Sequence, residues 1–292
     1  LGRGGDQVVI KNGEKITYYG GKAQQMEKTT RVKARVKAQA LKEFMSTKER
    51  VVVMGHKITD VDALGAAIGI YRAGKTLGKP VHIVVKDPST SIRPLMAGYM
   101  NNPDYEPSMF IDRNQAIDLV DDNTVVVVVD TNKPSYTECE DLLYLTKTIV
   151  VLDHHRRGNE VIQNAVLSYV EPYASSTCEM VAEILQYFSD DLRLRNIEAD
   201  CLYAGIMIDT NNFITRAGVR TFEAAAFLRR SGADMTRVRK MLRDNIDSYK
   251  ARAEAVRAAE IYRGCFAIAQ CPSKGLESPT VVGAQAANEL LN

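Results

Sequence analysis

The sequence lacks any apolar run long enough to cross a membrane. Its longest apolar run, Val125–Val129, has the length of a β-strand, whereas a transmembrane helix needs about 20 apolar residues. No secretory signal peptide is recognisable at the start of the chain either. We therefore expect this chain to be soluble.

Paired cysteines and a large net charge are also lacking. The five cysteines are irregularly spaced and none forms a C-x-x-C pair, which favours a reduced, intracellular protein. The net charge of +2 gives no general attraction to nucleic acid or to a membrane surface. With 45% hydrophobic and 25% charged residues over 292 positions, the sequence predicts two globular domains, or one domain with fragments of others.

What is present, from residue 50 to about residue 210, is an alternation of strand-like and helix-like segments. The strand-like runs are 50–54, 81–85, 124–129 and 148–152, and the helix-like segments include 62–77 and 113–118. This alternation predicts an α/β domain with a parallel sheet of five strands and helices on both faces. Residues 176–246 are expected to be helical, with breaks near residues 189, 211, 218 and 232.

The segments on either side predict smaller units. Residues 1–22 contain two strand-like runs around Asn12-Gly13, which is typical of a β-hairpin. Residues 23–48 predict a connecting helix with a solvated basic face, and residues 247–260 a helical linker. Residues 261–292 are expected to begin a smaller α/β domain that is incomplete in this chain. The main domain is then 49–246.

Histidines and aspartates gather where the apolar runs end. Ligand sites in open parallel sheets form at the carboxyl ends of the strands, so we expect these side chains to lie close together. The candidates are His56, Asp60 and Asp62 after the first run, Asp130 after the third, His154 and His155 after the fourth, and Asp209 after a later apolar segment.

A single aspartate at a strand end is more often a helix cap or a turn residue than a ligand. Taken together, the clusters favour metal binding over capping, because three of the four histidines fall in them. Carboxylate and imidazole ligands together suit Mn, Fe, Co or Zn, and the set is large enough for two ions about 3.5–4 Å apart that share a carboxylate. The fourth histidine, His82, lies inside a strand-like run and is expected to be structural.

The pattern His56-x3-Asp60-x-Asp62-x2-Gly65-Ala66, then Asp130, Asp153-His154-His155 and Asp209, resembles the four motifs of the DHH phosphoesterase superfamily. That superfamily includes RecJ-type exonucleases, nano-RNases, exopolyphosphatases and family II pyrophosphatases. Residues 1–9, 153–158, 171–177 and 216–224 are similar to GdpP-type cyclic di-AMP phosphodiesterases. By this resemblance, residues 1–22 are the remnant hairpin of a degenerate GGDEF domain, 49–246 the DHH domain, and 261–292 the start of a DHH-associated domain.

The resemblance implies metal-dependent hydrolysis of cyclic di-AMP to linear pApA, with two Mn²⁺ ions per chain and a bridging hydroxide; Co²⁺ or Mg²⁺ are alternatives to Mn²⁺. It assigns His56, Asp60 and Asp130 to one ion, and Asp62, Asp130, His154 and Asp209 to the other. His155 would be the catalytic group facing the phosphate. Ser175, Ser176, Thr177 and Arg216 would contact substrate, although Ser176 followed by Glu179 also fits a helix N-cap.

The resemblance also implies a homodimer, no binding of long nucleic acids, and a longer parent protein held at the cytoplasmic face of the membrane by upstream helices.

Two features depart from the family pattern. Thr59 stands where the family has proline, and the sequence contains no Gly-Gly-Gly-His loop. Alternative interpretations are a nano-RNase or pyrophosphatase of the same superfamily, or a nucleotide-sensing module without catalysis.

Overall fold

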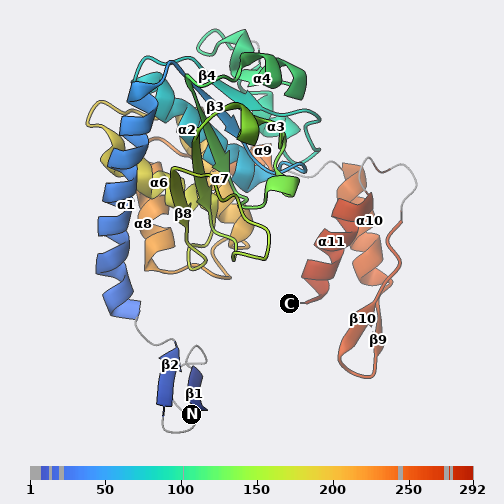
Figure 1. Cartoon of the computed structure of the whole chain (residues 1–292). Helices are drawn as coiled ribbons and strands as arrows, with labels where there is room; N and C mark the ends of the chain where they lie inside the picture. Colours follow the sequence, from blue (N-terminus) through green and yellow to red (C-terminus); the bar gives the residue numbers. More distant parts are fainter. Residues whose placement is uncertain are drawn as a thin grey trace.

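The computed structural model describes residues 8–12, 15–19, 23–100, 102–242, 246–272, 276 and 279–291. Its central feature is a six-stranded sheet in the order β5-β4-β3-β6-β7-β8, with every pair of neighbours parallel (Figure 1). The strands are β3 (Arg50–Met54), β4 (Val81–Val84), β5 (Phe110–Ile111), β6 (Thr124–Val129), β7 (Thr148–Asp153) and β8 (Leu167–Val170).

The α/β class and the parallel sheet are confirmed, but the predicted number of five strands was wrong. The four strands named from the sequence are all present, and the edge strands β5 and β8 complete the sheet. Strand β5 has only two residues, too few to show any periodicity, and β8 mixes polar and apolar residues. Both depend on pairing with a neighbouring strand.

Helices cover both faces of the sheet, as predicted. Alternate residues of a strand point to opposite faces, so Val125 and Val127 pack into one core and Val126 and Val128 into another. The first core is covered by α1 (Ala23–Thr47), α2 (Val61–Thr76), α3 (Arg93–Met96), α6 (Thr177–Phe188), α7 (Asn196–Asp209), α8 (Val219–Arg230) and α9 (Met235–Met241). The second, smaller core is covered by α4 (Arg113–Leu119) and α5 (Leu142–Leu145).

Close packing of α2 on α6 and α7 depends on Gly65. A Cβ atom at this position would lie 2.6 Å from Cys178 Sγ and 2.7 Å from the Cys201 carbonyl oxygen. The missing side chain therefore lets the starts of α2 and α6 approach each other. These two helix starts carry several of the side chains of the site described below.

The flanking elements largely follow the expectation. Strands β1 (Val8–Asn12) and β2 (Lys15–Tyr19) form an antiparallel hairpin, whose expected turn residue Gly13 lies outside the described residues. Helix α10 (Ile246–Arg257) leads to strands β9 (Glu260–Tyr262) and β10 (Phe266–Ile268) and to helix α11 (Pro279–Leu290). The antiparallel pairing of β9 with β10 was not expected from the sequence. The division into domains stays a prediction.

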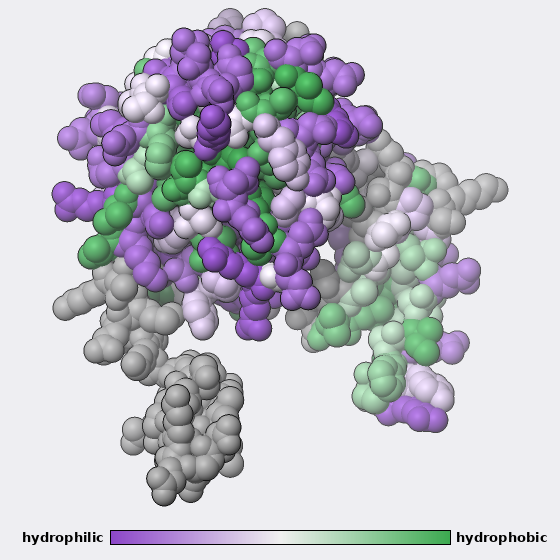
Figure 2. All heavy atoms as spheres, in the orientation of Figure 1, coloured by the Kyte–Doolittle hydropathy of each residue, from purple (hydrophilic) through white to green (hydrophobic). Residues whose placement is uncertain are grey.

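Apolar side chains gather on the surface of this C-terminal unit (Figure 2). The β9–β10 hairpin leaves Ile261, Phe266 and Ile268 exposed. Among the described residues, no helix has the combination of length and apolar character that crossing a membrane requires.

Candidate metal centre

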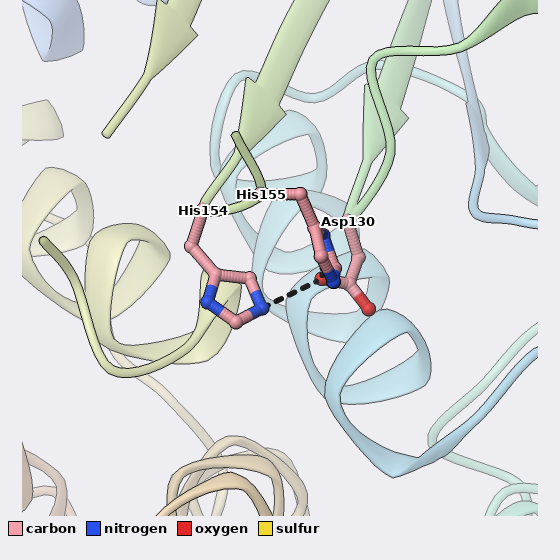
Figure 3. A group of neighbouring side chains, drawn as sticks. All are labelled: Asp130, His154 and His155. Carbon is pink, nitrogen blue, oxygen red and sulfur yellow. Dashed lines mark ion pairs between the residues drawn. The ribbon is translucent and has the colours of Figure 1, made fainter. Parts of the chain in front are cut away.

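The predicted ligands come together at the carboxyl edge of the sheet. His56 lies in the loop after β3, Asp60 is the N-cap of α2, and Asp62 lies in its first turn. Asp130 follows β6, His154 and His155 follow β7, and Asp209 is the last residue of α7. Two histidines thus reach Asp130 from the end of the adjacent strand (Figure 3).

One group consists of His56, Asp60 and Asp130. His56 Nε2 lies 3.6 Å from Asp60 Oδ2 and 3.5 Å from Asp130 Oδ2. Three such atoms within 4.8 Å of one another can surround a single ion. The ring of Tyr136 stacks on His56 with 5.4 Å between centroids and so limits how the imidazole can turn.

A second group consists of Asp62, His154 and Asp209. His154 Nε2 lies 3.9 Å from Asp62 Oδ2 and 3.4 Å from Asp209 Oδ2. The same nitrogen lies 3.4 Å from Asp130 Oδ1, the ion pair marked in Figure 3. One oxygen of Asp130 therefore faces the first ligand group and the other oxygen faces the second. A carboxylate that bridges two ions requires this arrangement.

Burial and mutual repulsion govern the charges of the site. Burial, reinforced by Asp130, raises the pKa of Asp62 well above its usual value and that of Asp209 to about 7. Burial alone would also raise the pKa of Asp130, but hydrogen bonds from His154 and His56 lower it below the usual value.

For the histidines, burial and hydrogen bonding affect the pKa with signs opposite to those for Asp130. Burial alone would lower the pKa of His56, but hydrogen bonds to Asp130 and Asp60 raise it to about 10. For His154 the hydrogen bond to Asp130 and the charge of Asp62 likewise overcome burial and raise the pKa to about 9. Buried carboxylates in this number need positive charge beside them, so the donor set and its charge both fit divalent cations.

His155 differs from the other histidines in exposure, because 56% of its side chain is accessible. Its Nδ1 lies 2.8 Å from Asp153 Oδ1 and 3.7 Å from Asp130 Oδ1. Asp153 is fully buried and also accepts a hydrogen bond from Asn132. Asp153 thus orients the ring of His155. Asp130, His154 and His155 also form a third group compact enough for an ion.

The predicted substrate contacts are placed differently. Ser175, Ser176 and Thr177 are buried, and their hydroxyls contact protein groups. Ser176 Oγ accepts from the Glu179 N–H at 3.0 Å, so the N-cap alternative is confirmed. The Glu179 carboxylate accepts from the Ser175 hydroxyl instead of completing a capping box. Burial favours a supporting role over substrate contact for these three residues.

Arg216 is exposed in the loop after α7, and its contact with substrate stays a prediction. His82 lies in β4 with Nδ1 2.6 Å from the Ser108 carbonyl oxygen, so its structural role is confirmed. Sequence reasoning assigned no role to Asn132, Asp153 or Tyr136. Asp153 stands beside the two histidines and Asn132 stands two residues after Asp130, so both had a signal in the sequence. Tyr136 meets His56 through a tertiary contact.

The chain is similar to several known proteins. Residues 50–206 match the model of the DHH family, N-terminal domain. The chain is 45% identical to the cyclic-di-AMP phosphodiesterase GdpP of Bacillus subtilis and 41% identical to the cyclic-di-AMP phosphodiesterase PdeA of Listeria monocytogenes. Each alignment covers 100% of this chain but 45% of the relative, so the chain spans about half the length of these curated proteins.

In structure the chain is similar to an exopolyphosphatase-related protein from Bacteroides fragilis, with a TM-score of 0.66 and 17% identity. The similarity covers 78% of this chain and 66% of that one, and at this identity it shows a shared fold. The family match includes the loops that carry His56, Asp130 and His154 and extends over more than half of the sequence. The chain therefore belongs to the DHH family.

Proposed function

We propose that this chain contains the catalytic domain of a cyclic di-AMP phosphodiesterase that hydrolyses its substrate to linear pApA. The observation that carries the proposal is the pair of ligand groups that share Asp130. The similarity to two proteins named cyclic-di-AMP phosphodiesterases favours this substrate among those of the superfamily.

In this proposal His56, Asp60 and Asp130 hold one divalent ion, and Asp62, Asp130, His154 and Asp209 hold the other. Two Mn²⁺ ions are expected, with Co²⁺ or Mg²⁺ as alternatives. Bound there, the ions would supply a water of lowered pKa and positive charge beside the attacked phosphate. The reaction adds the elements of water across one P–O bond of the ring, and the released ribose oxygen takes up a proton.

We propose that His155 either donates that proton or stabilises the negative charge on the phosphate. The pKa of His155 is raised, first by its hydrogen bond to Asp153, so the ring is better able to hold a proton near neutral pH. Its exposure gives a substrate access to the ring. Arg216 is proposed as a further contact for a phosphate, because its guanidinium can donate two parallel hydrogen bonds to phosphate oxygens.

The test is an assay of the purified chain with Mn²⁺ and three substrates offered separately: cyclic di-AMP, pApA and pyrophosphate. Appearance of pApA from cyclic di-AMP, at a rate above those for the other two substrates, is the expected result. Faster cleavage of pApA would indicate a nano-RNase, and faster cleavage of pyrophosphate a pyrophosphatase. Binding of cyclic di-AMP without any product would indicate a sensing module. Dimerisation and membrane attachment of a longer parent protein stay predictions.

A further inference from the structure

Thr177 is the first residue of α6 and contacts the carboxylates of both ligand groups. Its hydroxyl donates to Asp130 Oδ1 at 2.9 Å, and its backbone N–H donates to Asp62 Oδ2 at 2.7 Å. The next N–H, that of Cys178, donates to Asp62 Oδ1 at 2.9 Å. One helical turn therefore contacts both oxygens of Asp62 and the oxygen of Asp130 that faces His154.

We propose that Thr177 is a positioning residue for the metal centre and that its hydroxyl fixes the rotation of the Asp130 carboxylate. The inference rests on the proposed function insofar as Asp130 bridges two ions. A carboxylate oxygen has two lone-pair sites, so a donor on one of them leaves the other free and sets its direction. Hydrogen bonds to metal-ligating carboxylates orient the ligands in this way, and loss of one typically lowers metal affinity or activity about 10–100-fold.

The backbone of α6 performs the same task for Asp62. This carboxylate is almost completely buried and lies near other acidic groups, where an anion is costly. The first N–H groups of a helix have no partner within the helix, and the helix dipole places partial positive charge at this end. Donation from two of them, one to each oxygen of Asp62, fixes the rotation of this carboxylate.

Thr177 can serve as a fixed point because α6 is itself held by buried polar contacts. The Glu179 carboxylate accepts from the Ser175 hydroxyl at 2.5 Å and from the Thr221 hydroxyl at 2.6 Å. Arg220 Nε lies 3.3 Å from Glu179 Oε1 and also pairs with Glu183. These contacts tie the start of α6 to α8, so the Thr177 hydroxyl has a defined place relative to the sheet.

The decisive comparison is Thr177→Val with Thr177→Ser. Valine keeps the shape and the backbone N–H but loses the hydroxyl, whereas serine keeps the hydroxyl. Calorimetric titration of Mn²⁺ into metal-free protein should show an affinity about 10–100-fold weaker in Thr177→Val, the usual effect of losing such a contact. In Thr177→Ser most of the wild-type affinity should be restored. With cyclic di-AMP, kcat should fall while KM stays near the wild-type value, because the Thr177 side chain is buried and its hydroxyl donates to Asp130.

Thr146→Val is the matched control. The Thr146 hydroxyl is also buried and donates to the Thr124 carbonyl oxygen at 2.7 Å, but it lies just before β7, at the opposite edge of the sheet. This variant should lose stability without losing Mn²⁺ affinity. If Thr177→Val does not fold, Thr177→Ala carries the same expectation, since it leaves space and no misplaced methyl group.

A folded Thr177→Val protein with wild-type Mn²⁺ affinity would overturn the inference, and so would a serine variant as weak as the valine variant. The metal titration needs no substrate and therefore separates the two proposals. If wild-type protein does not cleave cyclic di-AMP but Thr177→Val still weakens Mn²⁺ binding, the proposed function fails and the positioning role stands.

Discussion

Asp130 has a left-handed backbone, with φ of 60°, at the point where β6 ends. Aspartate tolerates this region better than most residues with a side chain, and such conformations gather at functional sites. The turn occurs where one carboxylate oxygen faces His56 and the other faces His154. The sequence shows that residue 130 is an aspartate, and only the structure shows its left-handed backbone. The position of this ligand depends on both.

Asp62→Asn tests the second ligand group, because the substitution keeps the side-chain shape and removes the charge. Elemental analysis at saturating Mn²⁺ should fall from about two ions to about one per chain, and turnover of cyclic di-AMP should fall by more than about 100-fold. Asp104→Asn is the control, since Asp104 is exposed and pairs with Arg195 outside the site. Two ions bound by the Asp62→Asn protein would contradict the assignment.

His155→Ala distinguishes a substrate-facing group from a ligand. We expect metal content near the wild-type value and a turnover lower by about 10²–10⁴-fold, the range for loss of an acid–base group. Loss of one ion on elemental analysis would instead make His155 a ligand of the third group, with Asp130 and His154. His82→Ala, at a histidine that faces the Ser108 carbonyl, should change neither quantity.

At the scale of the elements, the helix starts are as important to the site as the strand ends. The strand ends could be located from the sequence, because apolar runs followed by acidic residues and histidines are local patterns. The start of α6 could be located too, but its partners could not. Ser175, Ser176 and Thr177 looked like substrate contacts, whereas Thr177 in fact reaches Asp62 and Asp130, 115 and 47 positions away in sequence.

Gly65→Ala tests whether α2 must approach α6 and α7 closely. The added Cβ would meet Cys178 Sγ and the Cys201 carbonyl oxygen, so we expect a loss of about 1–3 kcal/mol in the free energy of unfolding, as for other overpacked cores. Urea denaturation of the metal-free protein measures it. Gly158→Ala is the control, because only Lys133 Cε lies within 4 Å of the added Cβ there, at 3.7 Å. Equal stability of the two variants would show that the helices can separate without cost.

At the scale of the whole molecule, metal binding should be linked to pH. His56 and His154 must lose protons to bind cations, and their pKa values in the metal-free protein are raised to about 10 and about 9. Mn²⁺ affinity should therefore rise as pH increases from 7 to about 9. Calorimetric titrations in buffers of different ionisation enthalpy should show protons released on binding. An affinity independent of pH would contradict this linkage.

The same groups predict how stability without metal depends on pH. A histidine whose pKa is raised on folding stabilises the protein fully below its ordinary pKa near 6.5, and this contribution is lost as pH rises through the folded value. The melting temperature of metal-free protein should thus fall between pH 7 and pH 10. Saturating Mn²⁺ should oppose the fall, because the ion replaces the lost positive charge. Calorimetric melting curves with and without metal at the two pH values provide the comparison.

The sequence by itself determined the α/β class, the sheet strands β3, β4, β6 and β7, and the residues that could bind metal. These features are local, since strand length, apolar alternation and the chemistry of a side chain can all be recognised within a few neighbouring residues. Only the tertiary structure decided which oxygen of Asp130 faces which histidine, that β5 and β8 complete the sheet, and that Thr177 holds carboxylates. Each of these depends on contacts between residues far apart in the chain, which come into being when the strands and helices pack together.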